Sequence, residues 1–301
     1  RVGGKAVVLA TGGMGSNPEL IAKYSWFAPS AYNMNTLTPL QNMGDGLMMA
    51  LSAGADDTNI VTCPILAAGA RDKAMDSHIG AAGVQPGAIW INKTGRRFAN
   101  EGTAENIGDI GPLYGKQPDG IVWSVLDQAN IDRLAENGSE ISIGEFVVFG
   151  RPLDRLRMEL DQDVADGVAF AANTPEELAE KIGVSPENFA ATVAAYNEAC
   201  AAGDDKEFFK QEKYLRPLSI PPFYAVALAT GTMGSAGGIR INGNMQVVDK
   251  DYEPIPGLYA VGLDATGLYG DSYNMEVPGA ANGFAHTSGR IAGRHFAAQQ
   301  A

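Results

Sequence analysis

The same pattern, a short apolar run closed by glycines, occurs near both ends of this chain. Residues 5–10 lead towards Gly12 and Gly13, and residues 258–261 lead directly into Gly262. Short β-branched runs of this kind are typical of buried strands in a parallel sheet. We therefore predict an α/β fold in which the two ends of the chain form one discontinuous domain and the middle forms an insert.

The pattern of residues and predicted elements changes near residues 63 and 223, which sets the expected domain boundaries. Residues 1–62 and 224–301 are assigned to the discontinuous domain, with a parallel sheet, helices and some antiparallel strands. Residues 63–223 are assigned to an inserted α+β domain. A chain of 301 residues is long enough for this arrangement.

Local signals place the individual elements. Asn17 followed by Pro18 is typical of a helix start, and Asp45 is the expected N-cap of a helix that ends at Gly54. Strands are expected at residues 87–92, 121–125, 224–228, 238–241 and 246–248. Helices are expected near residues 127–135, after Thr174, after Ser185 and at 280–298.

Composition excludes several classes of function. The net charge of −13 repels nucleic acid and anionic lipid, so neither is an expected partner. No apolar run approaches the roughly 18 residues of a membrane span. The two cysteines are far apart and the three histidines form no helical pair, so no metal site is expected.

Two glycine-rich stretches are candidates for binding a ligand. Glycines after the first strand let a ligand approach the backbone closely, although Pro18 stands where a complete Gly-x-Gly-x-x-Gly turn needs its third glycine. Near the other end, Gly279 leads into a helix whose free N–H groups and positive dipole favour negative charge. Asp264, just past a strand, is either a ligand for ribityl or ribose hydroxyls or a turn former.

Several motifs occur in a fixed order along the chain. They are Ala-Thr-Gly-Gly at 10–13, Gly-Asp-Gly at 44–46, Gly-Arg-Arg-Phe-Ala-Asn-Glu at 95–101, Pro-Pro-Phe-Tyr-Ala at 221–225, Thr-Met-Gly at 232–234, Pro-Gly-Leu-Tyr-Ala at 256–260 and Gly-Arg-Ile-Ala-Gly at 289–293. The set resembles the fumarate reductase/succinate dehydrogenase flavoprotein family, which includes the 3-ketosteroid dehydrogenases. This resemblance implies an FAD-binding domain with an inserted cap domain over the substrate.

The resemblance also implies which residues contact FAD. They are Ala10, Thr11, Gly12, Asp45, Gly231, Asp264, Gly279, Ala281 and Asn282. The family's first βαβ unit, which holds the pyrophosphate and adenosine of FAD, has no counterpart here. We therefore expect a missing N-terminal segment or a companion chain to complete the site.

The positions that hold a dicarboxylate in fumarate reductases differ in this chain. The resemblance places Glu105 and Glu276 where those enzymes have arginines, and Thr230 and Gly231 where they have histidines. Because bidentate arginine recognition of carboxylates is missing, a neutral, ring-bearing substrate such as an enone, steroid or phenolic is expected.

The expected reaction is hydride transfer between FAD and a C=C or CH–CH bond. Tyr273 or Glu276 is the candidate catalytic acid or base, against the simpler alternatives of a packed aromatic and a solvated carboxylate. The alternative functions are a 3-ketosteroid dehydrogenase working oxidatively and a non-catalytic flavoprotein or electron-transfer subunit. No electron-entry module is visible, so an external electron donor is expected; the cytoplasm is the favoured compartment.

Overall fold

The structure, a computed structural model, separates into two compact units. The first comprises Arg1–Pro29, Thr36–Leu66 and Thr232–Ala301, and the second comprises Ser30–Asn35 and Ala67–Gly231. The chain thus divides at 66/67 and 231/232, a few residues beyond the predicted boundaries at 62/63 and 223/224. The structure describes residues 4–25, 32–33, 42–58, 60, 62–71, 73, 76–142, 147–265, 268–269, 273, 277 and 279–300.

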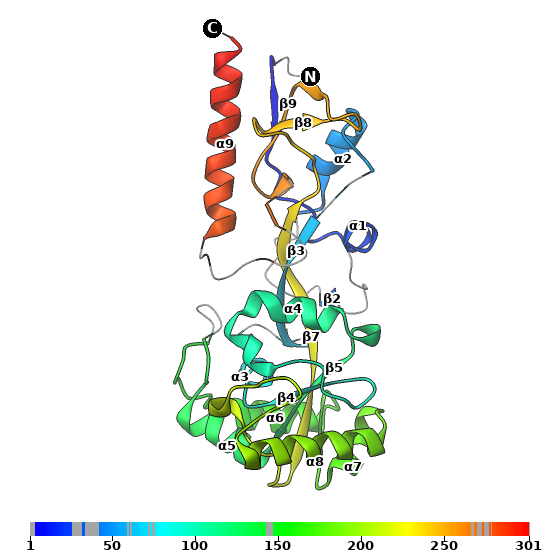
Figure 1. Cartoon of the computed structure of the whole chain (residues 1–301), viewed down its shortest axis with the longest axis vertical. Helices are drawn as coiled ribbons and strands as arrows, with labels where there is room; N and C mark the ends of the chain where they lie inside the picture. The colour runs from blue at the N-terminus through cyan, green and yellow to red at the C-terminus, as the bar shows by residue number, and fades with distance from the viewer. Residues whose placement is uncertain are drawn as a thin grey trace. The chain divides into compact units, whose positions relative to one another are not determined.

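The first unit contains a small sheet in the order β1-β9-β8 (Figure 1). β1 (Val7–Leu9) pairs in parallel with β9 (Pro254–Ala260), and β9 pairs antiparallel with β8 (Gln246–Val248). Residues at the two ends of the chain therefore share one sheet, as the α/β prediction requires. The expected strand at 238–241 is reduced to isolated bridges, because only Ile239 and Ile241 find partners there.

Three helices accompany this sheet. α1 (Pro18–Tyr24) begins as predicted, since the Asn17 side chain accepts hydrogen bonds from the first-turn N–H groups. α2 spans Asp45–Ser52, and α9 spans Ala280–Ala298, the predicted limits of the last helix. Among the described residues, two polar contacts join α9 to β9 and to the turn that follows it. The Gly262 N–H donates to Ser288 Oγ at 2.9 Å, and the Tyr259 hydroxyl lies 3.0 Å from His295 Nδ1.

The second unit is built on a mostly antiparallel sheet in the order β2-β7-β5-β4, and β3 and β6 also pair with β7. β7 is the long central strand, and β5 lies antiparallel between it and β4. The strands are β2 (Tyr32–Asn33), β3 (Thr62–Ala70), β4 (Ile89–Asn92), β5 (Val122–Asp127), β6 (Ala169–Ala172) and β7 (Phe223–Gly237). β3 and β7 contribute residues to both units.

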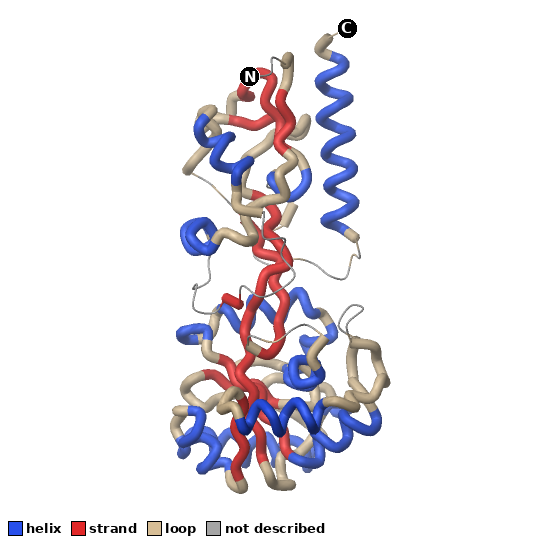
Figure 2. The backbone as a smooth tube through the Cα atoms, turned by 180° about the vertical axis from the view of Figure 1, so that it is seen from behind, coloured by secondary structure: helices blue, strands red, loops and turns tan. Residues whose placement is uncertain are grey.

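Helices cover both faces of this sheet (Figure 2). Alternation along β5 explains why: Val122 and Leu126 enter one hydrophobic cluster, whereas Val125 enters the other. α3, α4, α5 and α6 contribute to the first cluster, and α7 and α8 to the second. The helices are α3 (His78–Gly83), α4 (Ile107–Gly115), α5 (Gln128–Asn137), α6 (Leu156–Ala165), α7 (Pro175–Ile182) and α8 (Pro186–Ala202), with short 3-10 turns η2 (Glu101–Glu105), η3 (Pro118–Gly120) and η4 (Glu212–Tyr214).

The predicted α/β class is confirmed. The structure also contains elements that the sequence patterns did not predict, namely β3, α3, α4, α6 and β6. Within the described residues, no helix has both the length and the apolar character that crossing a membrane requires.

Candidate functional site

The loop after β1 is the first part of the candidate site. Ala10 and Thr11 are exposed at the carboxyl end of the strand, where glycines follow. Gly12 and Gly13 both have positive φ angles, 92° and 83°, which favour glycine. A side chain at Gly13 would also collide with Ser235, since its Cβ would lie 2.6 Å from Ser235 Oγ. The two glycines therefore let the loop turn sharply while Ala10 and Thr11 remain accessible.

Asp264 holds this loop in place. It belongs to η5 (Gly262–Asp264), directly after β9, and is only 2% exposed. Its carboxylate accepts hydrogen bonds from the backbone N–H of Thr11 and from the N–H of Gly13 at 2.9 Å. The Thr11 hydroxyl lies 3.0 Å from each carboxylate oxygen. Both oxygens thus have protein donors, and direct contact of Asp264 with a ligand stays a prediction.

The first turn of α2 closes against the same loop. The Gly46 N–H donates to Thr11 Oγ1 at 3.1 Å, and a Cβ at Gly46 would lie 2.5 Å from that oxygen. The expectation that Asp45 caps α2 is wrong. Gly44, with φ of 88°, is the N-cap, and Asp45 is the first helical residue. The left-handed backbone at the cap favours glycine, and it leaves the Asp45 side chain exposed.

The start of α9 is the second part of the candidate site. Gly279 is the N-cap, with φ of 77° and no side-chain cap. The Ala281 N–H donates to the Tyr273 hydroxyl at 3.0 Å, and Asn282 is exposed. The Ala280 N–H also donates to the Val277 carbonyl, so the helix start offers fewer free N–H groups than predicted.

The small residues of α9 make few packing contacts with the described residues. Only Ser288 and Ala292 of this helix are buried. No atom lies within 4 Å of the position that a Cβ would take at Gly283, Gly289 or Gly293. Among the described residues, this glycine face therefore has no close packing partner.

The structure brings most of the predicted cofactor residues into one unit. Gly231 is the exception, since it belongs to the second unit. Glu276 lies outside the described residues, whereas Tyr273 lies inside them and is 8% exposed. The predicted residues in the first unit are Ala10, Thr11, Gly12, Asp45, Asp264, Gly279, Ala281 and Asn282.

Three of the positions that hold a dicarboxylate in fumarate reductases lie in the second unit, namely Glu105, Thr230 and Gly231, and two of them carry polar side chains. Glu105 is exposed and pairs with Lys213 Nζ at 2.7 Å, while the Tyr214 hydroxyl donates to it at 2.6 Å. These two hydrogen bonds, that of Lys213 first, lower the pKa of Glu105 below its ordinary value. Thr230 is buried, and its hydroxyl donates to the Gly111 carbonyl. Neither position supplies a cation that could bind a substrate carboxylate.

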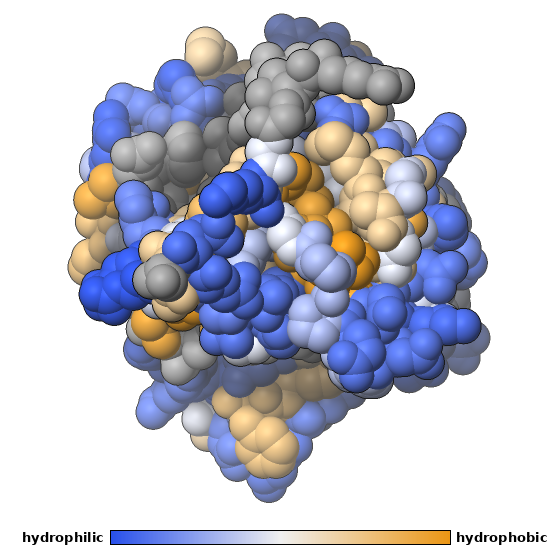
Figure 3. All heavy atoms as spheres, turned by 90° about the horizontal axis from the view of Figure 1, so that it is seen from above, coloured by the Kyte–Doolittle hydropathy of each residue, from blue (hydrophilic) through white to orange (hydrophobic). Residues whose placement is uncertain are grey.

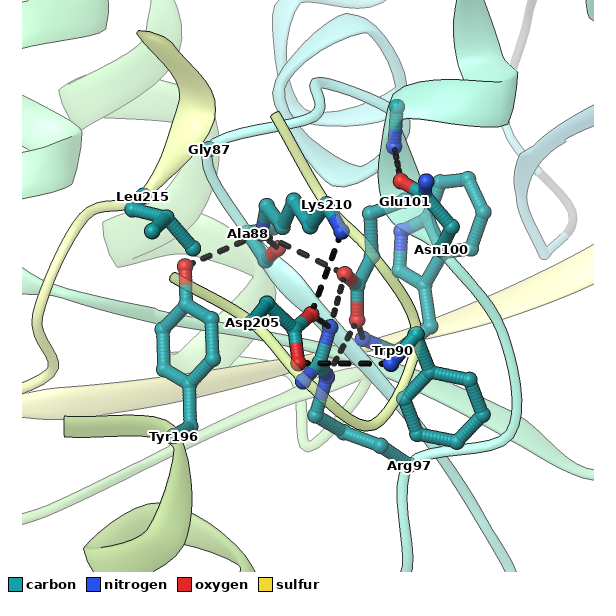
Figure 4. Close-up of polar contacts among 12 residues, drawn as sticks. Gly87, Ala88, Trp90, Arg97, Asn100, Glu101, Tyr196, Asp205, Lys210 and Leu215 are labelled. Carbon is teal, nitrogen blue, oxygen red and sulfur yellow. Dashed lines mark hydrogen bonds and ion pairs between the residues drawn. The ribbon is translucent and has the colours of Figure 1, made fainter. Parts of the chain in front are cut away.

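A buried ion cluster in the second unit was not predicted (Figure 4). Arg97 donates to Glu101 through Nε and Nη2, at 3.0 and 2.8 Å, and also to Asp205 at 2.9 Å. Lys210 Nζ lies 3.3 Å from Glu101. Burial alone would raise the pKa of Glu101, but Lys210 and Arg97 outweigh it and hold the pKa below its ordinary value.

The cluster is closed to solvent and therefore serves the fold. The Arg97 and Glu101 side chains are 3% and 0% exposed, and Lys210 also donates to the Ala88 carbonyl and the Tyr196 hydroxyl. Arg97 and Glu101 are four residues apart, so their pairing had a sequence signal. Asp205 and Lys210 are more than 100 residues away and had none. Within the described residues, no group of acidic, histidine or cysteine side chains could hold a metal ion.

The first unit contains features that fit a flavin cofactor. Backbone at the strand end and at the start of α9 is accessible, and Gly12, Gly13 and Gly279 have the left-handed conformations that allow close approach. A Cβ at Gly279 would meet nothing within 4 Å, so the N-terminus of α9 is open on that side. The exposed hydroxyl and N–H groups supply the polar contacts that a ribityl chain or a flavin ring edge requires.

Comparison with known proteins agrees with this geometry. The sequence profile of the family described as "FAD binding domain" matches residues 1–278. A vinyl phenol reductase from Lactiplantibacillus plantarum is 35% identical over 97% of this chain and 60% of its own length. A probable fumarate reductase, Ifc3, from Shewanella frigidimarina is 32% identical over 98% of this chain and 45% of its own length.

A solved structure shows the same fold. It is the 3-ketosteroid Δ1-dehydrogenase from Sterolibacterium denitrificans, with a TM-score of 0.73 and 24% identity over 98% of this chain and 53% of that protein. The chain belongs to the family described as FAD binding domain, and its relatives include a probable fumarate reductase, as the motifs predicted; FAD is its cofactor. It spans about half the length of these relatives.

Proposed function

We propose that this chain is the flavin-binding and substrate-capping part of an FAD-dependent oxidoreductase. The reaction is hydride transfer between the cofactor and a C=C or CH–CH bond of a neutral, ring-bearing substrate. The arrangement of Thr11, Gly46 and Asp264 carries the proposal, because it fixes an accessible glycine loop at the carboxyl end of a parallel strand. Ligands of α/β sheets bind at that edge. When bound, FAD supplies the hydride chemistry at its N5 atom.

The protein's own residues have three roles in this proposal. Thr11 and Gly12 hold the cofactor close to the strand end, and Asp264 keeps their loop rigid. The start of α9 stabilises negative charge on the flavin edge through the N–H groups of Ala281 and Asn282 and through the helix dipole. Tyr273 supplies the proton that accompanies hydride transfer, because its hydroxyl lies at the same helix start. Glu276 is the alternative acid that the sequence suggests.

The proposed substrate class follows from the absence of arginine at the positions that hold a dicarboxylate in fumarate reductases. Glu105 is held by Lys213 and Tyr214, and Thr230 by a backbone carbonyl, so neither supplies a cation. A dicarboxylate such as fumarate needs arginine forks for tight recognition. The 35% identity with a reductase named for vinyl phenol supports a phenolic or similar ring-bearing substrate.

The edge of β1 supports the proposal that another segment completes the FAD site. Among the described residues, β1 pairs only with β9, and Val7 and Val8 are 56% and 51% exposed. Figure 3 shows apolar surface among hydrophilic side chains on the face that it presents. Parallel sheets are normally buried on both faces, and free apolar edges attract further strands. We infer that another segment, from the same polypeptide or a companion chain, pairs here, and that an external donor supplies electrons.

Reoxidation of reduced flavin tests the proposed reaction. The chain is loaded with FAD, reduced anaerobically, and mixed with 4-vinylphenol, a cyclic enone or fumarate while flavin absorbance is followed. We expect the neutral compounds to reoxidise the flavin and fumarate to do so at least tenfold more slowly; reduced free FAD is the control. Preference for fumarate would refute the substrate class. Flavin binding without reoxidation by any alkene would instead indicate an electron carrier.

A further inference from the structure

The Tyr273 hydroxyl is hydrogen-bonded to the backbone N–H of Ala281, at the start of α9 where the proposed function places the flavin edge. Its hydroxyl accepts the Ala281 N–H at 3.0 Å, and the residue is 8% exposed. Its ring lies 5.0 Å from the Tyr269 ring, at an interplanar angle of 53°, in a cluster with Ala236 and Leu263. The phenol is therefore fixed by packing as well as by the hydrogen bond.

The other N–H groups of this helix start define what remains for a ligand. The Ala280 N–H donates to the Val277 carbonyl, and the Gly283 N–H donates to the Gly279 carbonyl. Gly279 provides no side-chain cap. Among the described residues, no acceptor lies at the Asn282 N–H. The Ala281 amide is thus the one first-turn donor that a side chain holds, since its neighbours bond to backbone or to no described residue.

We propose that Tyr273 competes with the flavin for the Ala281 amide and is a positioning residue for cofactor binding. This inference rests on the proposed function, which places the flavin edge at residues 281 and 282. One N–H makes one strong hydrogen bond, so the hydroxyl and a flavin carbonyl cannot both be bound fully by Ala281. The positive end of α9 favours the acceptor with more negative charge, and a neutral phenol is the weaker of the two.

The exchange has a consequence for the chemistry of Tyr273. While its oxygen is bound by the Ala281 N–H, the phenol is held against the helix. When a flavin carbonyl takes that N–H, the hydroxyl loses its donor and is available to a substrate beside the flavin. Cofactor binding would then position the proton donor, whereas a permanent Tyr273 cap would leave the flavin only the Asn282 N–H.

Affinity for riboflavin and FAD, measured by fluorescence quenching, separates these two arrangements. Riboflavin is included because it lacks the pyrophosphate and adenosine, and so reports on the flavin ring and ribityl contacts alone. We expect Y273F to bind both ligands about fivefold more tightly, the size of one net hydrogen bond. Y269F is the matched control, since Tyr269 shares the cluster but no contact between its hydroxyl and Ala281 is observed; its affinity should stay within twofold of wild type.

Thermal unfolding gives a second readout that does not depend on activity. Y273F should unfold a few degrees lower than wild type without flavin, because the cap is lost, and the difference should disappear at saturating flavin. If Y273F folds poorly, NMR of wild-type protein with ¹³Cζ-labelled tyrosine replaces it, and riboflavin should shift one buried tyrosine signal.

Two further results would overturn the inference in distinguishable ways. Unchanged or weaker flavin binding by Y273F, or unmoved tyrosine signals on binding, would overturn it while leaving the proposed function intact. Absence of flavin binding by wild type and both variants would overturn it together with the proposed function.

Discussion

The two units each bury a carboxylate, but they neutralise it differently. In the second unit, Glu101 is surrounded by the cations Arg97 and Lys210, and the side chains of the cluster are at most 3% exposed. In the first unit, Asp264 is bound by N–H and hydroxyl groups of a loop in which Thr11 is exposed. A carboxylate paired with buried cations is enclosed in a core. A carboxylate that binds the backbone of a loop leaves the opposite side of that loop accessible to a ligand. A buried acid therefore marks a candidate site only when its partners remain accessible.

Removing Glu101 from the buried ion cluster should have the largest effect on the free energy of unfolding. Glu101→Ala leaves two buried cations without their shared partner, and breaking such pairs costs about 3–5 kcal/mol. Urea unfolding of the second unit should report this loss. Glu105→Ala is the matched control in the same 3-10 turn, because its exposed pair with Lys213 contributes at most about 1 kcal/mol. Equal free energies of unfolding for the two variants would contradict the contrast between the units.

Changing the acid of the open site should have a smaller effect on stability and a clear one on the cofactor. In Asp264→Asn, an amide NH₂ group faces the N–H donor of Thr11 or Gly13 in place of a carboxylate oxygen. The lost hydrogen bond should lower the free energy of unfolding by about 1–3 kcal/mol. We expect riboflavin affinity to fall about tenfold, because the loop loses its fixed shape. Asp251→Asn, in an exposed turn, is the control. Unchanged riboflavin affinity in D264N would show that the loop does not position the flavin.

Asp56 is bound both by uncharged donors and by a cation. Its substitution should have the smallest effect on stability. The Thr58 hydroxyl and N–H, together with Arg240, lower its pKa from 3.8 to about 2. Because the pKa is lower in the folded state, this stabilisation is present above pH 3.8 and is lost as the pH falls towards 2. Thermal midpoints of Asp56→Asn should therefore lie a few degrees below wild type at pH 7 and approach it near pH 2. A difference that persists at pH 2 would assign the effect to packing instead.

Elements with strong local signals were predicted from the sequence. The limits of α9 followed from a glycine start and a long helical pattern, and the start of α8 followed from Ser185, whose side chain accepts the Asn188 N–H. The start of α7 was also predicted, since Thr174 caps it by accepting the Glu177 N–H. In each case the signal lies within one or two turns of the element itself.

The remainder depends on contacts between distant residues. β3 has no polar alternation and contains a proline, so only pairing with β7 makes it a strand. β7 runs on to Gly237 through glycines that otherwise indicate a loop. At the candidate site, the glycines and Asp264 were identified as candidates, but the bonds from Asp264 to Thr11 and Gly13 join residues about 250 positions apart. No local pattern encodes that closure.

The pairing of β1 with β9 also sets an order for synthesis. Val7 lies opposite Leu258, so β1 can pair with β9 only after about 250 further residues have been synthesised. Most strands and helices of the second unit come from the continuous stretch Ala67–Gly231 and can pack during that interval. A nascent chain that had reached only residue 231 would therefore carry a folded second unit and an unpaired, valine-rich β1 strand, which is a state prone to aggregation.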